Sequence, residues 1–266
     1  MIFGILNITE DSFSDGGKFL ASEAALTQAR ALARHAGVVD IGAAASNPDA
    51  KPVSPETEIA RLAPVAAALK QEGVPVSIDS YAPEVQRWAL AQDVDYLNDI
   101  QGFADAALYP DLARASAKLI VMHAVQGGGR ATRVEAPPSE IVERVRRFFA
   151  ARIAALTAAG VARERLILDP GMGFFLGADP RTSLVILRAI GSLKSEFGLP
   201  VLVSVSRKSF IRALAAVAAD AAGPASLAAE LFALHQGADH IRTHDPKGLA
   251  EASTVWKALA GDPARG

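Results

Sequence analysis

The chain has 266 residues, of which 50% are hydrophobic, and a formal net charge of −2. This size suits one barrel-sized domain, and since no linker-like stretch interrupts the sequence we expect a single domain over residues 1–266. The charge balance offers no basic surface for nucleic acid or anionic membranes, and no apolar stretch approaches the roughly 20 residues that a membrane span needs. The expected partners are therefore small molecules, with no nucleic acid and no membrane.

The sequence contains no cysteine, which excludes disulfides, thiolate catalysis and cysteine metal sites. The segment from Met1 to Leu6 is apolar but lacks the basic start of a signal peptide, so we expect a first strand there. A reducing compartment fits this composition, and we expect a cytoplasmic protein.

Short apolar runs rich in β-branched residues recur along the chain, as is typical of buried parallel strands. Alanine-rich amphipathic stretches lie between them, with helix-start signals such as Ser54 before Pro55 and Asp179 before Pro180. Strand and helix alternate eight times, which predicts an α/β fold of the TIM type, a closed (β/α)8 barrel with its helices outside. The predicted strands are Ile2–Leu6, Val38–Ile41, Val74–Ile78, Tyr96–Asn98, Leu119–Met122, Leu166–Leu168, Val201–Val205 and His240–Arg242.

In such barrels the active site lies at the carboxyl ends of the strands, so the polar residues there are the candidates. Arg242 and His244 are two residues apart, and side chains with this spacing in a strand face the same way and can grip a phosphate or pyrophosphate. Buried carboxylates such as Asp79 and Asp169 are costly unless they meet cations, Lys208 for example, or ligand donors. The remaining strand ends carry the run Asn7 to Gly17, Asn98, Asp99, His123 and the run Ser206 to Ser209.

The run Gly4 to Gly17, with its Asn-Ile-Thr-Glu-Asp-Ser-Phe-Ser-Asp-Gly-Gly core, resembles the opening signature of the dihydropteroate synthase family. The other strand ends agree with that family in type and order, so the resemblance covers essentially the whole chain. It implies condensation of a (7,8-dihydropterin-6-yl)methyl diphosphate with 4-aminobenzoate to give 7,8-dihydropteroate and diphosphate, a Mg2+ cofactor and a homodimer formed through outer helices.

The resemblance also implies a role for each matching residue. A carboxylate can accept two adjacent pterin N–H groups, and an amide side chain suits a mixed ring edge. We therefore expect the pterin to be bound by Asp79, Asn98, Asp169 and Lys208. We expect the diphosphate to be bound by Asn7, Arg242 and His244, and Mg2+ to be held partly by Asn7. The expected aminobenzoate site comprises Phe13, Ser46, Phe174, Arg207 and Ser209.

These roles predict a dissociative displacement, in which diphosphate leaves first, a pterin-stabilised methylene cation forms, and the neutral aromatic amine attacks. The residues expected to act directly in catalysis are Asp79, Asp169, Lys208, Arg242 and His244. No strong general base is required. We expect Arg242→Ala to weaken binding of the diphosphate substrate more than binding of a pterin.

Two segments depart from the family pattern. Where the family shows Ser-Thr-Arg-Pro, the run Ala43 to Pro48 has no arginine. Anion binding by this loop is therefore weaker, or other residues supply the positive charge. After Gly173-Phe174, where the family continues with a small residue and a lysine, this chain has the bulky apolar pair Phe175-Leu176. Both changes resemble the sulfonamide-insensitive branch found on mobile resistance elements, or a chromosomal relative of it, with Phe175 as the side chain at the pocket rim that excludes the drug.

Other polar residues have structural interpretations beside functional ones. We interpret His123 as a hydrogen-bonding structural histidine, Asp40 as a strand-end cap, and Asp99 as a helix cap or a partner of Lys208. The stretch from Val125 to Pro138 is either a mobile loop over the site or a plain surface excursion. Two other functions stay open: a pterin-binding methyltransferase module and a catalytically silent pterin-binding protein.

Overall fold

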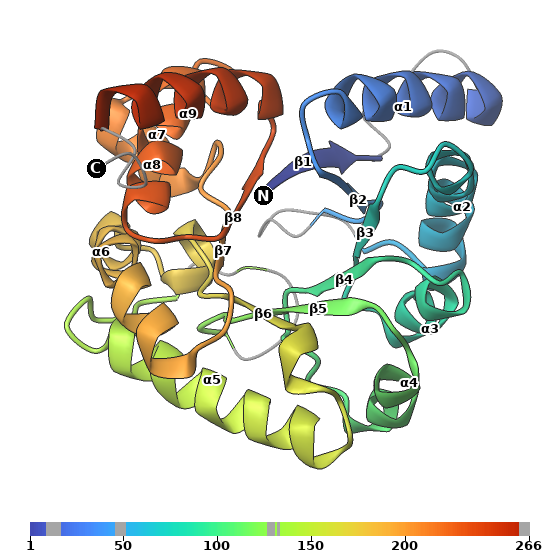
Figure 1. Ribbon diagram of the computed structural model, residues 1–266, viewed down its shortest axis with the longest axis horizontal. Coiled ribbons are helices and arrows are strands. Elements are labelled where there is room, and N and C mark those ends of the chain that lie inside the picture. Colours follow the sequence, from blue (N-terminus) through green and yellow to red (C-terminus); the bar gives the residue numbers. More distant parts are fainter. Residues whose placement is uncertain (9–16, 46–51, 127–130, 132–133, 261–266) are drawn as a thin grey trace.

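The computed structural model describes residues 1–8, 17–45, 52–126, 131 and 134–260. Eight parallel strands form one sheet in the order β6-β5-β4-β3-β2-β1-β8-β7, and an isolated bridge between Leu168 and Val201 brings its two edges together. The predicted barrel is confirmed, with the strands as a ring and the helices around it (Figure 1). The strands are β1 Ile2–Asn7, β2 Val38–Gly42, β3 Val76–Asp79, β4 Tyr96–Asp99, β5 Lys118–Met122, β6 Leu166–Asp169, β7 Leu202–Val203 and β8 His240–Thr243.

The helices begin where the sequence predicts. Ser54 accepts a hydrogen bond from the Thr57 amide at 3.3 Å, and Asp179 accepts one from the Arg181 amide at 2.8 Å, so both side chains cap the helix that follows. The helices are α1 Gly17–Ala33, α2 Pro55–Gln71, α3 Pro83–Ala91, α4 Tyr109–Arg114, α5 Ile141–Ala158, α6 Pro180–Phe197, α7 Ser209–Ala215, α8 Gly223–His235 and α9 Pro246–Ala260. The described residues also include the short 3-10 turns η2 Ala106–Leu108, η3 Arg163–Arg165 and η4 Gly173–Leu176.

Apolar side chains fill the interior of the barrel toward the amino ends of the strands. A buried cluster joins residues from six strands, and the aromatic rings of Phe3 and Tyr96 meet edge to face at 5.0 Å. A larger apolar layer lies between the sheet and the helices. Because these side chains fill the barrel toward the amino ends of its strands, we expect a ligand to enter from the carboxyl ends of the strands.

The strand register brings polar residues into one row at that end. Asn7 pairs with Gly42, Gly42 with Asp79, and Asp79 with Asn98. Side chains in one row of a parallel sheet face the same way. The register therefore gathers residues that are far apart in the sequence at the mouth of the barrel.

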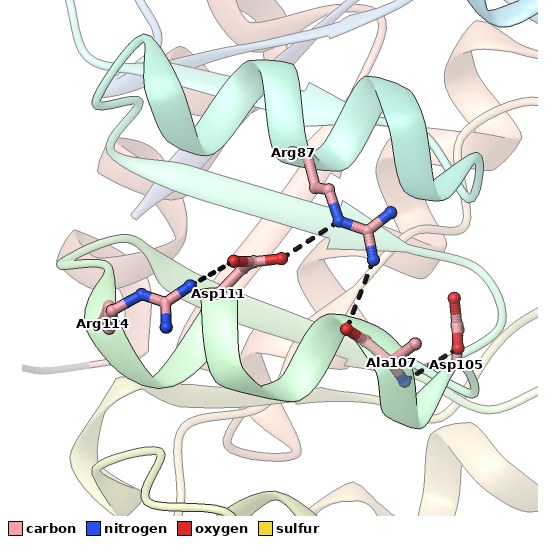
Figure 2. A network of polar contacts seen from close by, with 5 residues as sticks. All are labelled: Arg87, Asp105, Ala107, Asp111 and Arg114. Carbon is pink, nitrogen blue, oxygen red and sulfur yellow. Dashed lines mark hydrogen bonds and ion pairs between the residues drawn. The ribbon is translucent and has the colours of Figure 1, made fainter.

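A polar network fixes two neighbouring helices on the outside. Arg87 of α3 donates to Asp111 of α4 at 3.0 Å and to the Ala107 carbonyl of η2 at 3.3 Å, and Arg114 pairs with the same carboxylate at 2.5 Å (Figure 2). Within the part of the chain that the structure describes, no helix combines the length and apolar character required to span a bilayer.

Candidate active site

A pocket opens at the carboxyl ends of the strands. The four residues predicted to bind a pterin, Asp79, Asn98, Asp169 and Lys208, all line it, and so does Arg242. Asp79 is the last residue of β3 and Asn98 the next to last of the neighbouring β4, whereas Asp169 ends β6. Ser204, Met172 and Phe175 complete the pocket with Ile100 and Met122, and the sequence alone did not single out most of these lining residues.

Arg242 is ion-paired with two carboxylates inside the barrel. Its Nε lies 2.5 Å from Asp40 and one terminal nitrogen lies 2.6 Å from Asp79. The Asp40 side chain is fully buried, so its interpretation as a strand-end cap is wrong. The signal was present in the sequence: Asp40 interrupts the apolar run Val38–Ile41 and shares the inward face with Gly42 by the two-residue period of a strand.

The cluster holds more carboxylates than cations. Asp40, Asp79 and Asp169 face Arg242 and Lys208, so full ionisation leaves one net negative charge in a desolvated site. Burial raises the pKa of Asp79 to about 7 against the attraction of Arg242, and burial raises the pKa of Asp169 to about 6. Burial, reinforced by Arg242, lowers the pKa of Lys208 to about 8. The site is therefore partly protonated near neutral pH.

Several acceptor atoms in the pocket point to a ligand with N–H donors. Asn98 is 3% exposed, and its Oδ1 has no hydrogen-bond partner among the described residues. The hydroxyl of Ser204, which is also buried, likewise has no hydrogen-bond partner among the described residues. Such groups cost stability unless a ligand or water satisfies them. Asp169 accepts from the Gly171 amide at 2.8 Å with one oxygen.

Two features fix the geometry around Asp169. Gly171 has φ of +76°, and a Cβ at this position would lie 2.4 Å from the His123 carbonyl, so only glycine fits. His123 is buried, its Nδ1 lies 3.2 Å from the Pro170 carbonyl, and burial lowers its pKa to about 4. These contacts agree with the structural interpretation of His123.

Phe175 lies inside the pocket and not at its rim. Its side chain is 4% exposed, and the Lys208 ammonium lies 4.9 Å from its ring centroid, a cation–π contact. The ring packs with Met122 and Ile100 in a small apolar cluster. Phe175 therefore adjoins the predicted pterin residues directly.

The residues predicted to bind the diphosphate differ in burial and in charge. His244 follows β8, and its Nδ1 lies 3.0 Å from the Ser206 hydroxyl. Burial lowers the pKa of His244 to about 3, with a further contribution from Arg242, so its ring is neutral at pH 7. Asn7 is exposed at the end of β1. Only Arg242 of these three residues supplies a positive charge.

The predicted aminobenzoate residues that the structure describes lie on adjoining loops. Phe174 is half-buried in η4, Arg207 is exposed after β7, and Ser209 begins α7. The start of η4 packs tightly on α7, because a Cβ at Gly173 would lie 3.0 Å from the Ser209 hydroxyl. The structure thus brings these three residues to one side of the barrel mouth. Phe13 and Ser46 lie outside the described residues.

Asp99 has a structural role. Its carboxylate accepts from the amides of Gln101 at 2.7 Å and Phe103 at 2.9 Å and so closes the turn after β4. The two alternatives for this residue, a helix cap or a partner of Lys208, are both replaced by a turn cap. Among the described residues no group of three or more His, Asp or Glu side chains is arranged to hold a metal ion.

The fold and the site define a barrel enzyme of the pterin-binding class, and the family model described as "Pterin binding enzyme" matches residues 3–244. The dihydropteroate synthase type-2 of Escherichia coli is 60% identical over 260 residues, which cover 97% of this chain and 96% of that protein. The chain therefore belongs to the dihydropteroate synthase family.

Solved structures agree. A Xanthomonas albilineans dihydropteroate synthase with 4-aminobenzoic acid superposes with a TM-score of 0.87 at 34% identity, over 98% of this chain and 94% of that one. The enzyme of the same organism in complex with 7,8-dihydropteroate gives 0.86 at 33% identity, with the same coverage. These similarities favour the synthase over a pterin-binding methyltransferase module.

Proposed function

We propose that this dihydropteroate synthase binds the pterin ring of its diphosphate substrate between Asp79, Asn98, Asp169 and Lys208. The observation that carries the proposal is the buried acceptor set, above all the unpartnered Asn98 Oδ1 beside two carboxylates of raised pKa. An amino group and ring N–H groups would satisfy these acceptors, and the Lys208 ammonium would donate toward the ring carbonyl and N5.

In the proposed reaction the bond between the methylene carbon and the diphosphate oxygen breaks, and a bond from that carbon to the aminobenzoate nitrogen forms. The nitrogen then loses one proton to solvent or to the departing diphosphate. Arg242 stabilises the leaving diphosphate because charge grows on its oxygen. A guanidinium has five N–H groups and the contacts with Asp40 and Asp79 use two, so three remain for the substrate.

His244 supports the diphosphate as a neutral hydrogen-bonding group, since its lowered pKa leaves it uncharged. This histidine is neutral, and the run Ala43 to Pro48 lacks the arginine of the family's Ser-Thr-Arg-Pro run. Arg242 therefore carries most of the positive charge that the described residues direct at the diphosphate. The aromatic amine is neutral at pH 7, so the attack requires no strong base.

We propose Mg2+ as the cofactor, bound together with the substrate. Asn7 offers an exposed amide oxygen at the end of β1, which fits a cation that prefers oxygen ligands and keeps several waters. When bound, the ion supplies charge neutralisation on the diphosphate. The experiment is a turnover assay with both substrates that follows diphosphate release: chelation should abolish release, added Mg2+ should restore it, and no release with Mg2+ present would refute the synthase assignment.

The aminobenzoate site is proposed at Phe174, Arg207 and Ser209, extended by Phe13 and Ser46. Arg207 is exposed and free to attract the carboxylate, and Phe174 offers an aromatic surface for the ring.

We further propose that the enzyme is insensitive to sulfonamides. Phe175 lies directly after Phe174 of the proposed aminobenzoate site and beside Lys208, in space that the small residue of the family pattern would leave open. Its ring can therefore penalise the larger drug more than aminobenzoate. Phe175→Ala should lower the sulfonamide inhibition constant at least tenfold, whereas Arg87→Ala, on the outer surface of α3, should leave it unchanged. An inhibition constant that equals that of a sensitive enzyme would remove the proposal.

A homodimer is proposed through the outer helices α7, α8 and α9. Large apolar side chains are exposed there, namely Leu214, Phe232, Val255, Trp256 and Leu259. Sedimentation analysis should show twice the chain mass. The cytoplasmic location stays a prediction.

A further inference from the structure

Helix α8 turns polar side chains toward the barrel. Ser226 is 4% exposed and Glu230 is 2% exposed, one helical turn apart, while the large apolar Phe232 is 38% exposed. Burying a hydroxyl and a carboxylate is costly unless they bind something. No motif in the sequence marks these two residues, and their contacts in the folded chain provide the reason to examine them.

Ser226 holds the backbone of Arg207. The Arg207 amide donates to the Ser226 hydroxyl at 3.0 Å, and Arg207 has φ of +59°, the left-handed region that non-glycine residues rarely adopt. Arg207 lies between Ser206, which contacts His244, and Lys208, which lines the pocket. Lys208 has backbone contacts of its own, since its amide donates to the Val205 carbonyl at 3.1 Å and its carbonyl accepts from the Ile211 amide at 3.1 Å. Loss of the Ser226 bond therefore acts mainly on Arg207.

Glu230 holds the end of β8. Its carboxyl group hydrogen-bonds the Thr243 hydroxyl, and that hydroxyl also accepts from the Asp245 amide at 3.1 Å. Thr243 is 1% exposed and lies between Arg242 and His244, with its side chain on the opposite face of the strand. Tethering Thr243 on the outside therefore fixes the two inward side chains.

We propose that Ser226 and Glu230 are positioning residues, each for one substrate: Ser226 sets Arg207 for the aminobenzoate carboxylate, and Glu230 sets Arg242 and His244 for the diphosphate. This inference rests on the substrate roles proposed above. The two residues act through separate strand ends, so their effects fall on different Michaelis constants.

Ser226→Ala should raise the KM for aminobenzoate about five- to tenfold, the loss expected from one hydrogen bond, and leave the KM for the pterin diphosphate within about twofold. Ser226→Thr, which keeps the hydroxyl, should restore the normal value. Ser192→Ala, at an exposed helical serine that donates to the Ala189 carbonyl of its own helix, is the matched control and should change neither constant. If Ser226→Ala does not fold, Ser226→Cys, whose sulfur is a weak acceptor, takes its place.

Glu230→Met should raise the KM for the pterin diphosphate by about five- to tenfold with little effect on aminobenzoate. Glu230→Gln keeps an oxygen for the Thr243 hydroxyl and should stay near the wild-type value. Glu251→Gln on α9, an exposed member of a helix-surface pair with Lys247, is the control. If Glu230→Met does not fold, Thr243→Val removes the same bond from the other side.

Arg207→Ala separates this inference from the proposed function. If Arg207→Ala raises the aminobenzoate KM and Ser226→Ala does not, the positioning role of Ser226 is refuted while the substrate role of Arg207 holds. If Arg207→Ala has no effect, the proposed aminobenzoate site fails first. Lower melting temperatures with both KM values unchanged would show that Ser226 and Glu230 serve stability alone.

Discussion

Two ion networks of similar geometry lie in opposite environments, one on the outer surface and one at the barrel mouth. On the surface, Asp111 pairs with Arg87 at 3.0 Å and with Arg114 at 2.5 Å (Figure 2), and the two arginine side chains are 44% and 73% exposed. Water and salt screen such pairs, so each contributes little to stability.

At the barrel mouth, Arg242 pairs with Asp40 at 2.5 Å and with Asp79 at 2.6 Å, and its side chain is only 12% exposed. There the lost hydration outweighs the attraction for one partner, because the pKa of Asp79 is raised to about 7 despite the adjacent guanidinium. Similar distances therefore have different consequences: the surface pairs fasten two helices, whereas the buried pairs leave part of the site's negative charge uncompensated.

The largest effect is expected from Arg242→Ala. This change leaves Asp40 and Asp79 buried beside each other without their cation, and breaking a buried pair in this way costs about 3–5 kcal/mol. Urea unfolding at pH 8 should show that loss. The added change Asp40→Asn should recover part of it, and a loss below about 1 kcal/mol would place this network in the same class as the surface one.

The next effect is expected from Asp169→Asn. An amide cannot accept charge-assisted bonds from the pterin, and bonds of this kind contribute about 1.5–3 kcal/mol, so pterin affinity should fall about 10- to 150-fold by calorimetry. The unfolding free energy at pH 8 should not fall, because the variant no longer buries a carboxylate of raised pKa. Near-normal turnover would overturn the assignment of Asp169 to the pterin.

The strands and the polar strand ends were predictable from the sequence, because period and composition are local signals. All eight predicted strands exist, although β7 is reduced to two residues and β3 begins at Val76 instead of Val74. Register and partner choice are not local. The pairing of Asp40 with Arg242 joins residues 202 positions apart and depends on how the barrel closes.

The positions of Phe175 and Ser226 depend on tertiary packing in the same way. A sequence places Phe175 after β6 but does not show that its ring turns in over Lys208. Ser226 lies in an alanine-rich helix with no motif, and only the folded chain shows its bond to the Arg207 amide.

A pH dependence of pterin binding should follow from the raised carboxylate pKa values. Binding requires the ionised carboxylates and the Lys208 ammonium, so below about pH 7 the ligand must displace protons from the carboxylates. Affinity should drop about tenfold from pH 7.5 to pH 6, and it should fall again above pH 8, where Lys208 loses its proton. Calorimetry in buffers of different ionisation enthalpy should show proton release. The folded-state pKa values exceed the unfolded ones, so these same groups lower stability as the pH rises from about 4 to about 7.

The Asp169→Asn variant tests which carboxylate is responsible. In this variant the affinity change near pH 6, which we assign to Asp169, should disappear. The change near pH 7, which we assign to Asp79, should remain. A flat affinity profile in the wild-type protein would contradict the raised pKa values of both groups.

The smallest effect is expected from Asp111→Asn at the surface. The change removes the partner of Arg87 and Arg114 but leaves both guanidinium groups in water, so the unfolding free energy should fall by less than about 1 kcal/mol. Most of that small loss should vanish in 1 M salt, where charges are screened within about 3 Å, and turnover should be unchanged. A loss as large as that of Arg242→Ala would mean that exposure does not separate the two networks, and the contrast between them would fail.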